Sequence, residues 1–320
     1  SNSPDGNITE KGAQAQVLRS TTARNVKTCN TFACPTAPTA LPNFATGNAS
    51  ITAAMLGAAN ATERTALINY QLGRDVNDED ADATTTTEMR PSAHGDVVHS
   101  RPVAINYGTD ATPQVVVYYG GNDGVLRAIN GNRTTAIGSV VAGQELWAFV
   151  APEFFGNIKR LRDNNVEISF TGNTTPDPVP QPKPYGLDGT ITAYKDGTSA
   201  WIYSTARRGG RVVYAFDVST IHTDTSSPRV LWKVGCPNLG NDTDCTTGFS
   251  DIGQTWSAPK VLKAMGYGSG ASPMVMMGGG YDSCEDGDPH SCTALSKGRK
   301  VYLLDAATGA ERWSVSVNGP

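Results

Sequence analysis

Six cysteines occur as three close pairs, so thiol chemistry is the first chemistry that this sequence offers. The pairs are Cys29 with Cys34, Cys236 with Cys245, and Cys284 with Cys292. Six cysteines can pair in many ways, but short separations inside turn-rich loops favour disulfides between neighbours. Zinc is the alternative, and a zinc site needs further cysteine or histidine ligands at close spacing. We expect three local disulfides, which indicate an oxidising compartment.

Two acidic segments could bind calcium through carboxylate oxygens. The first is "YDSCEDGDPH", whose carboxylates would repel one another unless a cation or water screens them. Its candidate ligands are Asp282, Glu285, Asp286 and Asp288. The second is "RDVNDEDAD", in which Asp75, Asn77 and Glu79 alternate as oxygen ligands would, although Asp80 stands where an EF-type loop needs glycine. Solvated loops are the alternative for both segments.

Catalytic residues are not indicated by any motif. The chain has no G-x-S-x-G elbow, P-loop or dinucleotide fingerprint. In "HGDVVH", strand alternation would put His94 and His99 on opposite faces. We expect no catalytic residue, no bound organic cofactor and no enzymatic activity, and we treat calcium as the single candidate cofactor.

Charge and hydropathy exclude two classes of partner. The 26 basic and 30 acidic residues give a net charge of −4, and no long run of lysine or arginine offers a footprint for nucleic acid. No apolar stretch is long enough to span a bilayer. The polar start of the chain lacks the pattern of a signal peptide, so we expect a mature, exported piece.

Residues 1–95 are predicted to form a helical or irregular lead-in segment. Short helices are expected in "KGAQAQVLRS" and "SITAAMLG". The clearest helix is "NATERTALINYQLG", where Asn60 can cap the first turn and Glu63 stands three residues later, as in a capping box. Gly73 is expected to end this helix.

Residues 96–320 repeat a pattern of short apolar runs, glycine-rich turns and a strand that holds a tryptophan. The repeated tryptophans are Trp147, Trp232 and Trp313. Each repeat reads as four strands, which is typical of propeller blades that bury their faces on one another. We therefore predict an all-β fold with about three blades of a modified β-propeller, and these tryptophans as the residues that pack between blades. Closed propellers have about four to eight blades, so either blades are missing or the lead-in segment supplies strands. Unrelated hairpins in a sandwich are the alternative.

Several longer segments follow one another along the chain: "TERTALINYQLGRD", "MRPSAHGDVVHSRPVAINYG", "VYYGGNDGVLRAIN", "GQELWAFVAPEFF", "DIGQTWSAPKV" and "KGRKVYLLDAATG". In this order they resemble the C-terminal domain of the PilY1 (PilC) family of type IV pilus proteins. The resemblance implies a modified propeller after a lead-in segment and export through the periplasm to the cell surface or pilus tip. It also implies roles in pilus biogenesis, adhesion and twitching motility, with minor pilins and host or abiotic surfaces as partners. The calcium loop of the family, D-x-[DN]-x-D-G-x-x-D, is not reproduced in this sequence.

A quinoprotein dehydrogenase is the alternative function. "GGNDGVLRAIN", "DAATGAERW" and "GQELW" resemble the blade motif that those enzymes share. Such enzymes typically carry two adjacent cysteines beside the quinone, and no two cysteines are adjacent in this sequence. We therefore favour a non-enzymatic surface protein.

Overall fold

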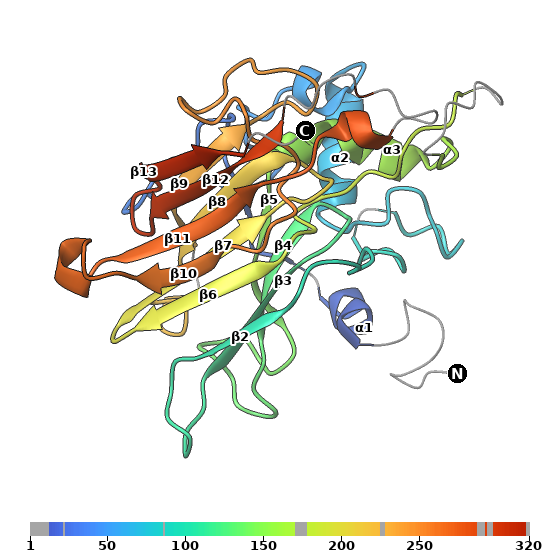
Figure 1. The fold of residues 1–320 in the computed structure, drawn as a ribbon. Coiled ribbons are helices and arrows are strands. Elements are labelled where there is room, and N and C mark those ends of the chain that lie inside the picture. The colour runs from blue at the N-terminus through green and yellow to red at the C-terminus, as the bar shows by residue number, and fades with distance from the viewer. Residues whose placement is uncertain are drawn as a thin grey trace.

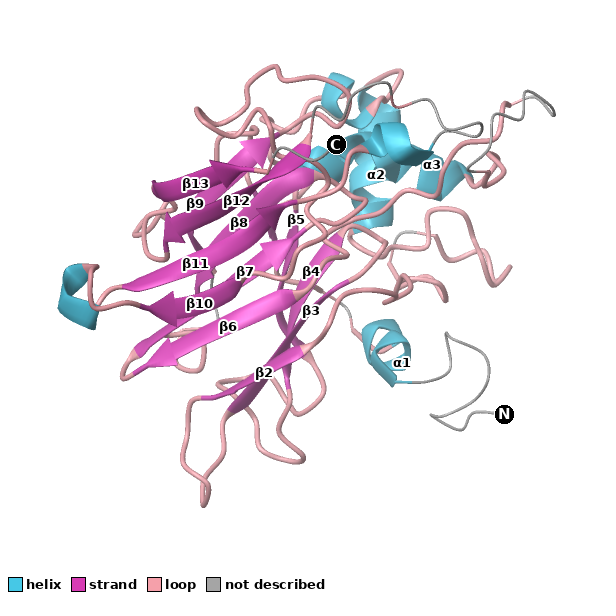
Figure 2. Ribbon diagram, in the orientation of Figure 1, coloured by secondary structure: helices cyan, strands magenta, loops and turns pink. Residues whose placement is uncertain are grey.

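The computed structural model describes residues 13–21, 23–85, 87–169, 178–224, 228–286, 292 and 297–317. Three β-sheets lie one behind another, and two of the three described α-helices lie together near one end of the sheets, with the first helix apart from them (Figures 1 and 2). The helices are α1 (Ala13–Arg19), α2 (Ala61–Gln71) and α3 (Phe155–Asp163), with short 3₁₀ turns at Ala54–Leu56, Pro152–Phe154, Gly268–Gly270 and Ser283–Asp286.

The first sheet has five strands in the order β1-β5-β4-β3-β2. The strands are β1 (Val26–Thr28), β2 (Val103–Asn106), β3 (Val115–Gly120), β4 (Val125–Asn130) and β5 (Glu145–Val150). β2 to β5 form an antiparallel meander, whereas β1 pairs in parallel with β5, from Val26 opposite Ala148 to Thr28 opposite Val150. The lead-in segment therefore contributes a strand to the first sheet.

The second and third sheets are four-stranded antiparallel meanders in chain order. The second consists of β6 (Ile191–Asp196), β7 (Ser199–Thr205), β8 (Arg211–Asp217) and β9 (Arg229–Cys236). The third consists of β10 (Lys260–Lys263), β11 (Pro273–Gly279), β12 (Gly298–Asp305) and β13 (Glu311–Ser316). The predicted first strands of the repeats are β2, β6 and β10, which lie side by side in Figure 1.

Apolar side chains fill the two interfaces between sheets. Between the first and second sheets, Phe149 contacts Tyr214 and Phe216 edge-on, with ring centroids 5.3 and 5.1 Å apart. Between the second and third sheets, Tyr203 and Trp232 belong to the same buried cluster as Tyr302. Burial of aromatic rings on this scale is the main stabilising contribution that each sheet gains from its neighbour.

The lead-in segment packs on the other face of the first sheet. Leu67 and Ile68 of α2 are fully buried in a cluster with Val125 and Val150 of the sheet and with Ile158 of α3. The first turn of α2 is held as predicted, because the side chain of Asn60 accepts a hydrogen bond from the Glu63 backbone N–H at 2.9 Å. The expected four-stranded antiparallel sheets are confirmed. The division at residue 95 stays a prediction.

Candidate functional sites

The repeated tryptophans occupy equivalent register positions in the three sheets. Each tryptophan stands at the end of a row of three paired residues that crosses its sheet. The rows are Tyr118–Ala128–Trp147, Tyr203–Ala215–Trp232 and Met276–Leu303–Trp313. In the first two rows every residue is buried, whereas Met276 and Trp313 are 42% and 52% exposed.

Trp147 and Trp232 lie at the interfaces between sheets. The ring of Trp147 lies 6.1 Å from that of Phe216 in the next sheet. The indole N–H of Trp232 donates to the carbonyl of Ala306, at 2.9 Å, and its ring lies against Gly309, where a side chain would collide with it. Trp313 lies on the last strand, and its packing role stays a prediction.

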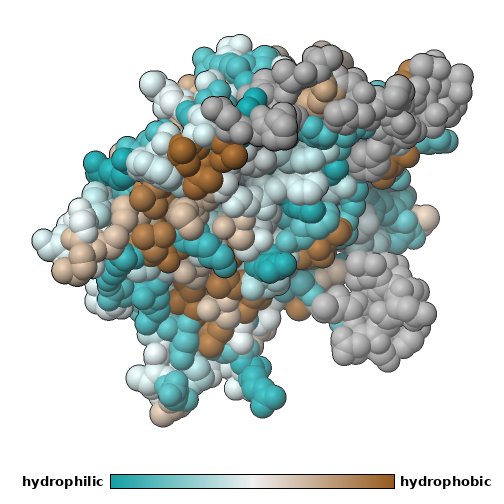
Figure 3. Space-filling model, in the orientation of Figure 1, coloured by the Kyte–Doolittle hydropathy of each residue, from teal (hydrophilic) through white to brown (hydrophobic). Residues whose placement is uncertain are grey.

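The outer face of the third sheet is exposed and partly apolar. Figure 3 shows apolar side chains among polar ones over its strands. Exposed residues there include Met276, Trp313 and Val315. On the other sheets the equivalent row is covered by the next sheet, so this face is a candidate packing surface.

Three disulfides join the six cysteines in the predicted pairs. They link Cys29 to Cys34, Cys236 to Cys245, and Cys284 to Cys292, and none of the six is free. This pairing excludes thiolate ligands for zinc at these positions.

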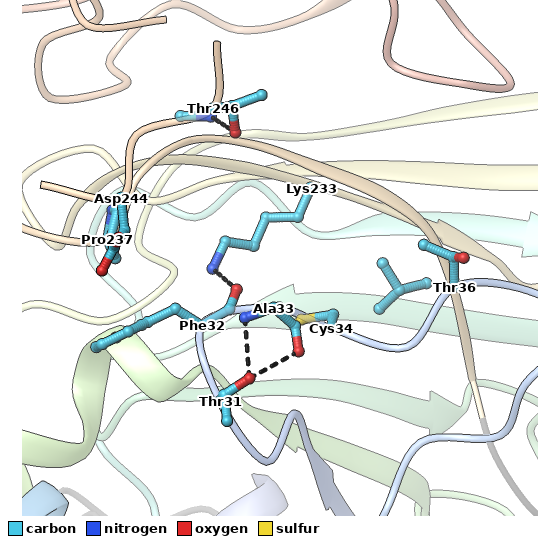
Figure 4. Close-up of a pocket in the computed structure, with 11 residues that line it drawn as sticks. Thr31, Phe32, Ala33, Cys34, Thr36, Lys233, Pro237, Asp244 and Thr246 are labelled. Atoms are coloured by element: carbon cyan, nitrogen blue, oxygen red, sulfur yellow. Dashed lines mark hydrogen bonds between the residues drawn. The ribbon is translucent and has the colours of Figure 1, made fainter.

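A cavity of about 540 Å³ lies between the first two disulfide loops (Figure 4). Phe32 lies in the loop that Cys29 and Cys34 close, and Asp244 lies in the loop that Cys236 and Cys245 close. β9 runs between these loops. Its Lys233 ammonium donates to the Phe32 carbonyl at 2.6 Å and pairs with the buried carboxylate of Glu153. The charge of Lys233 is thus already neutralised inside the protein.

The acidic insertion of the third sheet holds two of its predicted ligands in internal contacts. Asp282 accepts hydrogen bonds from the backbone N–H groups of Cys284 and Lys297 at 3.1 and 3.0 Å. The two terminal guanidinium nitrogens of Arg208 donate hydrogen bonds to the carboxylate of Asp286, at 2.7 and 2.9 Å. These bonds hold the pKa of Asp286 below its usual value. Asp288 lies outside the described residues. The calcium site predicted here remains untested, and Arg208 supplies a competing positive charge.

The residues of the second predicted calcium set each make contacts inside the protein, and their calcium site stays a prediction. Both carboxylate oxygens of Asp75 accept from the Glu79 backbone N–H, at 2.9 and 3.0 Å. Glu79 itself contacts Ser92, and the Asn77 amide donates to the carbonyl of Arg162. These contacts describe a structured acidic turn.

A different carboxylate cluster forms at the base of this turn. One oxygen each of Asp75, Asp80 and Glu88 lies within 4.8 Å of the others, and Asp75 is fully buried. Oε1 of Glu88 is buried and has no hydrogen-bond partner among the described residues. Burial, and then the charges of Asp82, Asp80 and Asp75, raise the pKa of Glu88. Glu88 was not predicted as a ligand because it lies eight positions after Asp80 in the sequence.

Buried charges tie the lead-in segment to the first sheet. Arg24 donates to both carboxylate oxygens of Glu145 on β5, at 2.9 and 2.8 Å. Arg127 on β4 is fully buried and pairs with Asp123. Burial alone would raise the pKa of Asp123, but Arg127 lowers it well below the usual value.

His94 belongs to this buried region. Its Nε2 lies 2.8 Å from the hydroxyl of Tyr119, and burial lowers the pKa of His94 to about 4. His99 instead lies 2.6 Å from the buried carboxylate of Asp188. The two histidines have different partners, and nothing in their geometry resembles a catalytic pair.

A cluster of arginine and aromatic side chains joins the loops of the second and third sheets. The Arg207 guanidinium lies 4.2 Å from the centre of the Trp256 ring, and Trp256 stacks on Tyr281 at 4.6 Å. Arg207 has a φ of 50°, and its backbone forms a bridge with Thr255. This cluster was not predicted because an arginine, and not a glycine or asparagine, occupies the left-handed position.

Comparison with known proteins supports the family resemblance. In an alignment 313 residues long that covers 88% of this chain, the chain is 26% identical to the type IV pilus biogenesis factor PilY1 homolog of Xylella fastidiosa. The chain spans 22% of that relative, about a fifth of its length. The resemblance to PilY1 proteins that the motifs indicated is therefore confirmed. No family model matches the chain.

Solved structures with partial similarity include three bacterial proteins. The PilY1 C-terminal domain of Pseudomonas aeruginosa is 20% identical, covers 64% of this chain and 31% of its own, and has a TM-score of 0.36. BamB of Moraxella catarrhalis is 14% identical, and the match covers 69% of this chain and 39% of BamB with a TM-score of 0.29. The quinohemoprotein alcohol dehydrogenase ADHIIG of Pseudomonas putida is 14% identical, and the match covers 63% of this chain and 25% of the dehydrogenase with a TM-score of 0.28. Among the described residues, every helix is too short or too polar to cross a bilayer.

Proposed function

We propose that this PilY1-like chain is part of a non-enzymatic type IV pilus biogenesis factor, in which its sheets act as blades of a modified β-propeller. The similarity to the Xylella fastidiosa factor along 88% of the chain carries this proposal. The protein is exported through the periplasm to the cell surface or pilus tip. There it supports pilus assembly, adhesion and twitching motility through contacts with minor pilins and with host or abiotic surfaces.

The equivalent tryptophan rows support the propeller arrangement. The same side of the first and second sheets, marked by Trp147 and Trp232, faces the following sheet. The corresponding row of the third sheet, ending at Trp313, is exposed and partly apolar. A further sheet packed on that row would repeat the interface that the chain already uses twice.

Three disulfides support the proposed location. Disulfides of this kind persist in oxidising compartments such as the periplasm and the cell surface. A quinoprotein dehydrogenase is the alternative, and it requires a bound quinone that colours the protein. An absorption spectrum of protein purified from its native host separates the two functions.

Deletion of the gene in its native bacterium tests the proposal. We expect loss of surface pili and of twitching zones, restored by the full-length wild-type gene. Full-length protein with Trp232→Ala should restore little, because Trp232 joins two sheets, whereas Val141→Ala, at an exposed position, should restore fully. Normal piliation in the deletion strain would contradict the proposed function.

Calcium binding is a second proposed property, and it rests on the cluster of Asp75, Asp80 and Glu88. Calcium takes six to eight oxygen ligands, mostly carboxylates, carbonyls and waters. The buried Oε1 of Glu88, which has no partner among the described residues, is the observation that fits a cation. If calcium binds, these three residues would hold it and thereby fix the acidic turn on the lead-in segment.

A further inference from the structure

The outer edge of β9 is paired at both ends and open in the middle. At one end, the Ala37 backbone N–H donates to the Val230 carbonyl at 2.7 Å. At the other end, the Thr246 N–H donates to the Gly235 carbonyl at 2.8 Å, and the Gly235 N–H donates to the Thr246 hydroxyl at 3.2 Å. Both ends of this edge are therefore protected by the protein itself.

Lys233 lies between these ends with its backbone groups directed outward. The N–H and C=O groups of Gly235 both point away from β8. In an antiparallel pair, the direction in which these two groups point alternates from one residue to the next. Lys233, two residues earlier in the same continuous register, therefore presents its N–H and C=O to the outer edge. Within the described part of the chain, no loop or side-chain group bonds to either of them. Such groups are a template for pairing with another strand.

The open edge faces the cavity of about 540 Å³ shown in Figure 4. From Val230 to Gly235 the strand spans about 17 Å, which is room for about three or four extended residues. Each side wall is a loop closed by its own disulfide, so a covalent bond constrains the shape of each wall. Phe32, 40% exposed, supplies an apolar wall.

The first sheet shows that this fold accepts strand addition at the corresponding edge. β5 is the equivalent outer strand, and β1 covers it through three residue pairs in parallel. The lead-in segment then continues to β9 but pairs only once, with Thr36 opposite Val230 in parallel. The second sheet therefore has an incomplete version of the pairing that the first sheet has in full.

We propose that this edge binds a short extended segment of another protein by strand addition, with Lys233 supplying backbone hydrogen bonds. The segment carries an apolar side chain against Phe32. A basic side chain suits the site better than an acidic one, because the exposed Asp244 lines the cavity and Glu153 already neutralises Lys233. This inference does not depend on the pilus function.

Hydrogen exchange of the free chain tests the premise. The amide of Val234, which faces β8, should exchange at least about a hundredfold more slowly than the amide of Lys233. Equal protection of the two amides would show that the edge is already paired and would overturn the proposal.

Peptide selection tests the binding. A random heptapeptide phage library is panned on the intact chain, and the selected peptides are measured by fluorescence anisotropy. Ala33→Trp fills the cavity from an exposed lining position, and Ala111→Trp is the matched control in the exposed loop between β2 and β3. We expect Ala33→Trp to weaken binding at least about tenfold and Ala111→Trp to leave it unchanged.

Backbone methylation separates strand addition from side-chain binding. Methylating alternate peptide nitrogens should weaken binding at least about tenfold with a period of two, because only every second N–H faces β9. The proposal is overturned if the library yields no binder, if binders are insensitive to Ala33→Trp, or if methylation has no periodic effect.

Discussion

The indole nitrogen of Trp232 and the backbone carbonyl of Ala306 lie 2.9 Å apart and join the second sheet to the third. The same Ala306 carbonyl also accepts a hydrogen bond from the hydroxyl of Tyr203. Two side chains of the second sheet therefore donate to one carbonyl of the third. Because both donors are buried, this contact combines aromatic burial with hydrogen bonds shielded from water. The interface is therefore specific in register as well as apolar.

Replacing Trp232 should test the strength of this interface. We expect Trp232→Ala to lower the free energy of unfolding by about 3–5 kcal/mol through the cavity it leaves, and Trp232→Phe to lower it by about 1 kcal/mol through the lost hydrogen bond. Urea unfolding of the 320-residue chain measures both. Trp313→Ala is the control, with a change within about 0.5 kcal/mol because Trp313 is half exposed. An equal loss for Trp313→Ala would contradict this account.

His94 should make the chain less stable in mild acid. Burial lowers the pKa of His94 to about 4, so between the ordinary value of 6.5 and about 4 the unfolded chain binds a proton that the folded chain does not. Stability contributed by neutral His94 is therefore complete above pH 6.5 and falls as the pH decreases toward 4, by at most about 3 kcal/mol.

Urea unfolding at pH 7.0 and 5.0 checks this prediction, because few carboxylates titrate in that interval. His94→Gln should reduce the difference in unfolding free energy between the two pH values. An unchanged difference would assign the pH dependence to other groups.

Cys29 and Cys34 should stabilise the chain modestly. Their disulfide closes a short loop, with a sequence separation of 5, so the double variant Cys29→Ser, Cys34→Ser should lose about 2 kcal/mol. Thermal unfolding measures the loss, and thiol titration of the denatured wild type should find no free thiol before reduction. Reactive thiols in the unreduced wild type would contradict the pairing.

Calcium should stabilise the acidic turn through Glu88. We expect millimolar calcium to raise the melting temperature by at least about 2 °C, since a ligand that binds only the folded state stabilises it. Glu88→Gln should abolish this increase. Without calcium the same variant should be as stable as wild type or more stable, because it removes repulsion among neighbouring carboxylates. Asp110→Asn, at an exposed position outside the cluster, is the control. An equal increase in wild type and Glu88→Gln would locate calcium elsewhere.

Features set by local sequence were predictable, whereas features set by distant contacts were not. The cap at Asn60 depends on Glu63, three residues away, and the structure has it as expected. The strand β1 is only three residues long. Its Thr28 pairs with Val150, which lies 122 residues later, so no local sequence pattern could predict this strand.

The candidate sites follow the same division. The cysteine pairs lie within single loops and were predictable from spacing. Glu88 reaches Asp75 because the Asp75 backbone N–H bonds to the Glu88 carbonyl at 3.2 Å, a contact that follows from the fold of the turn. Arg207 contacts Trp256 in a turn where Arg207 itself has the left-handed conformation. Arginine rarely adopts this conformation, so the sequence does not indicate the turn.

The parallel pairing of β1 with β5 constrains the order in which a newly made chain can fold. Residues 26–28 have no sheet partner until Val150 has been synthesised, and Thr36 has none until Val230 follows. Residues 26–28 and Thr36 therefore stay without these partners while the chain that follows them is being made. Folding of the first sheet is thus complete only after the strand that carries Val150 has been added, so this early segment has an exposed strand edge for longer than β2 to β5 do.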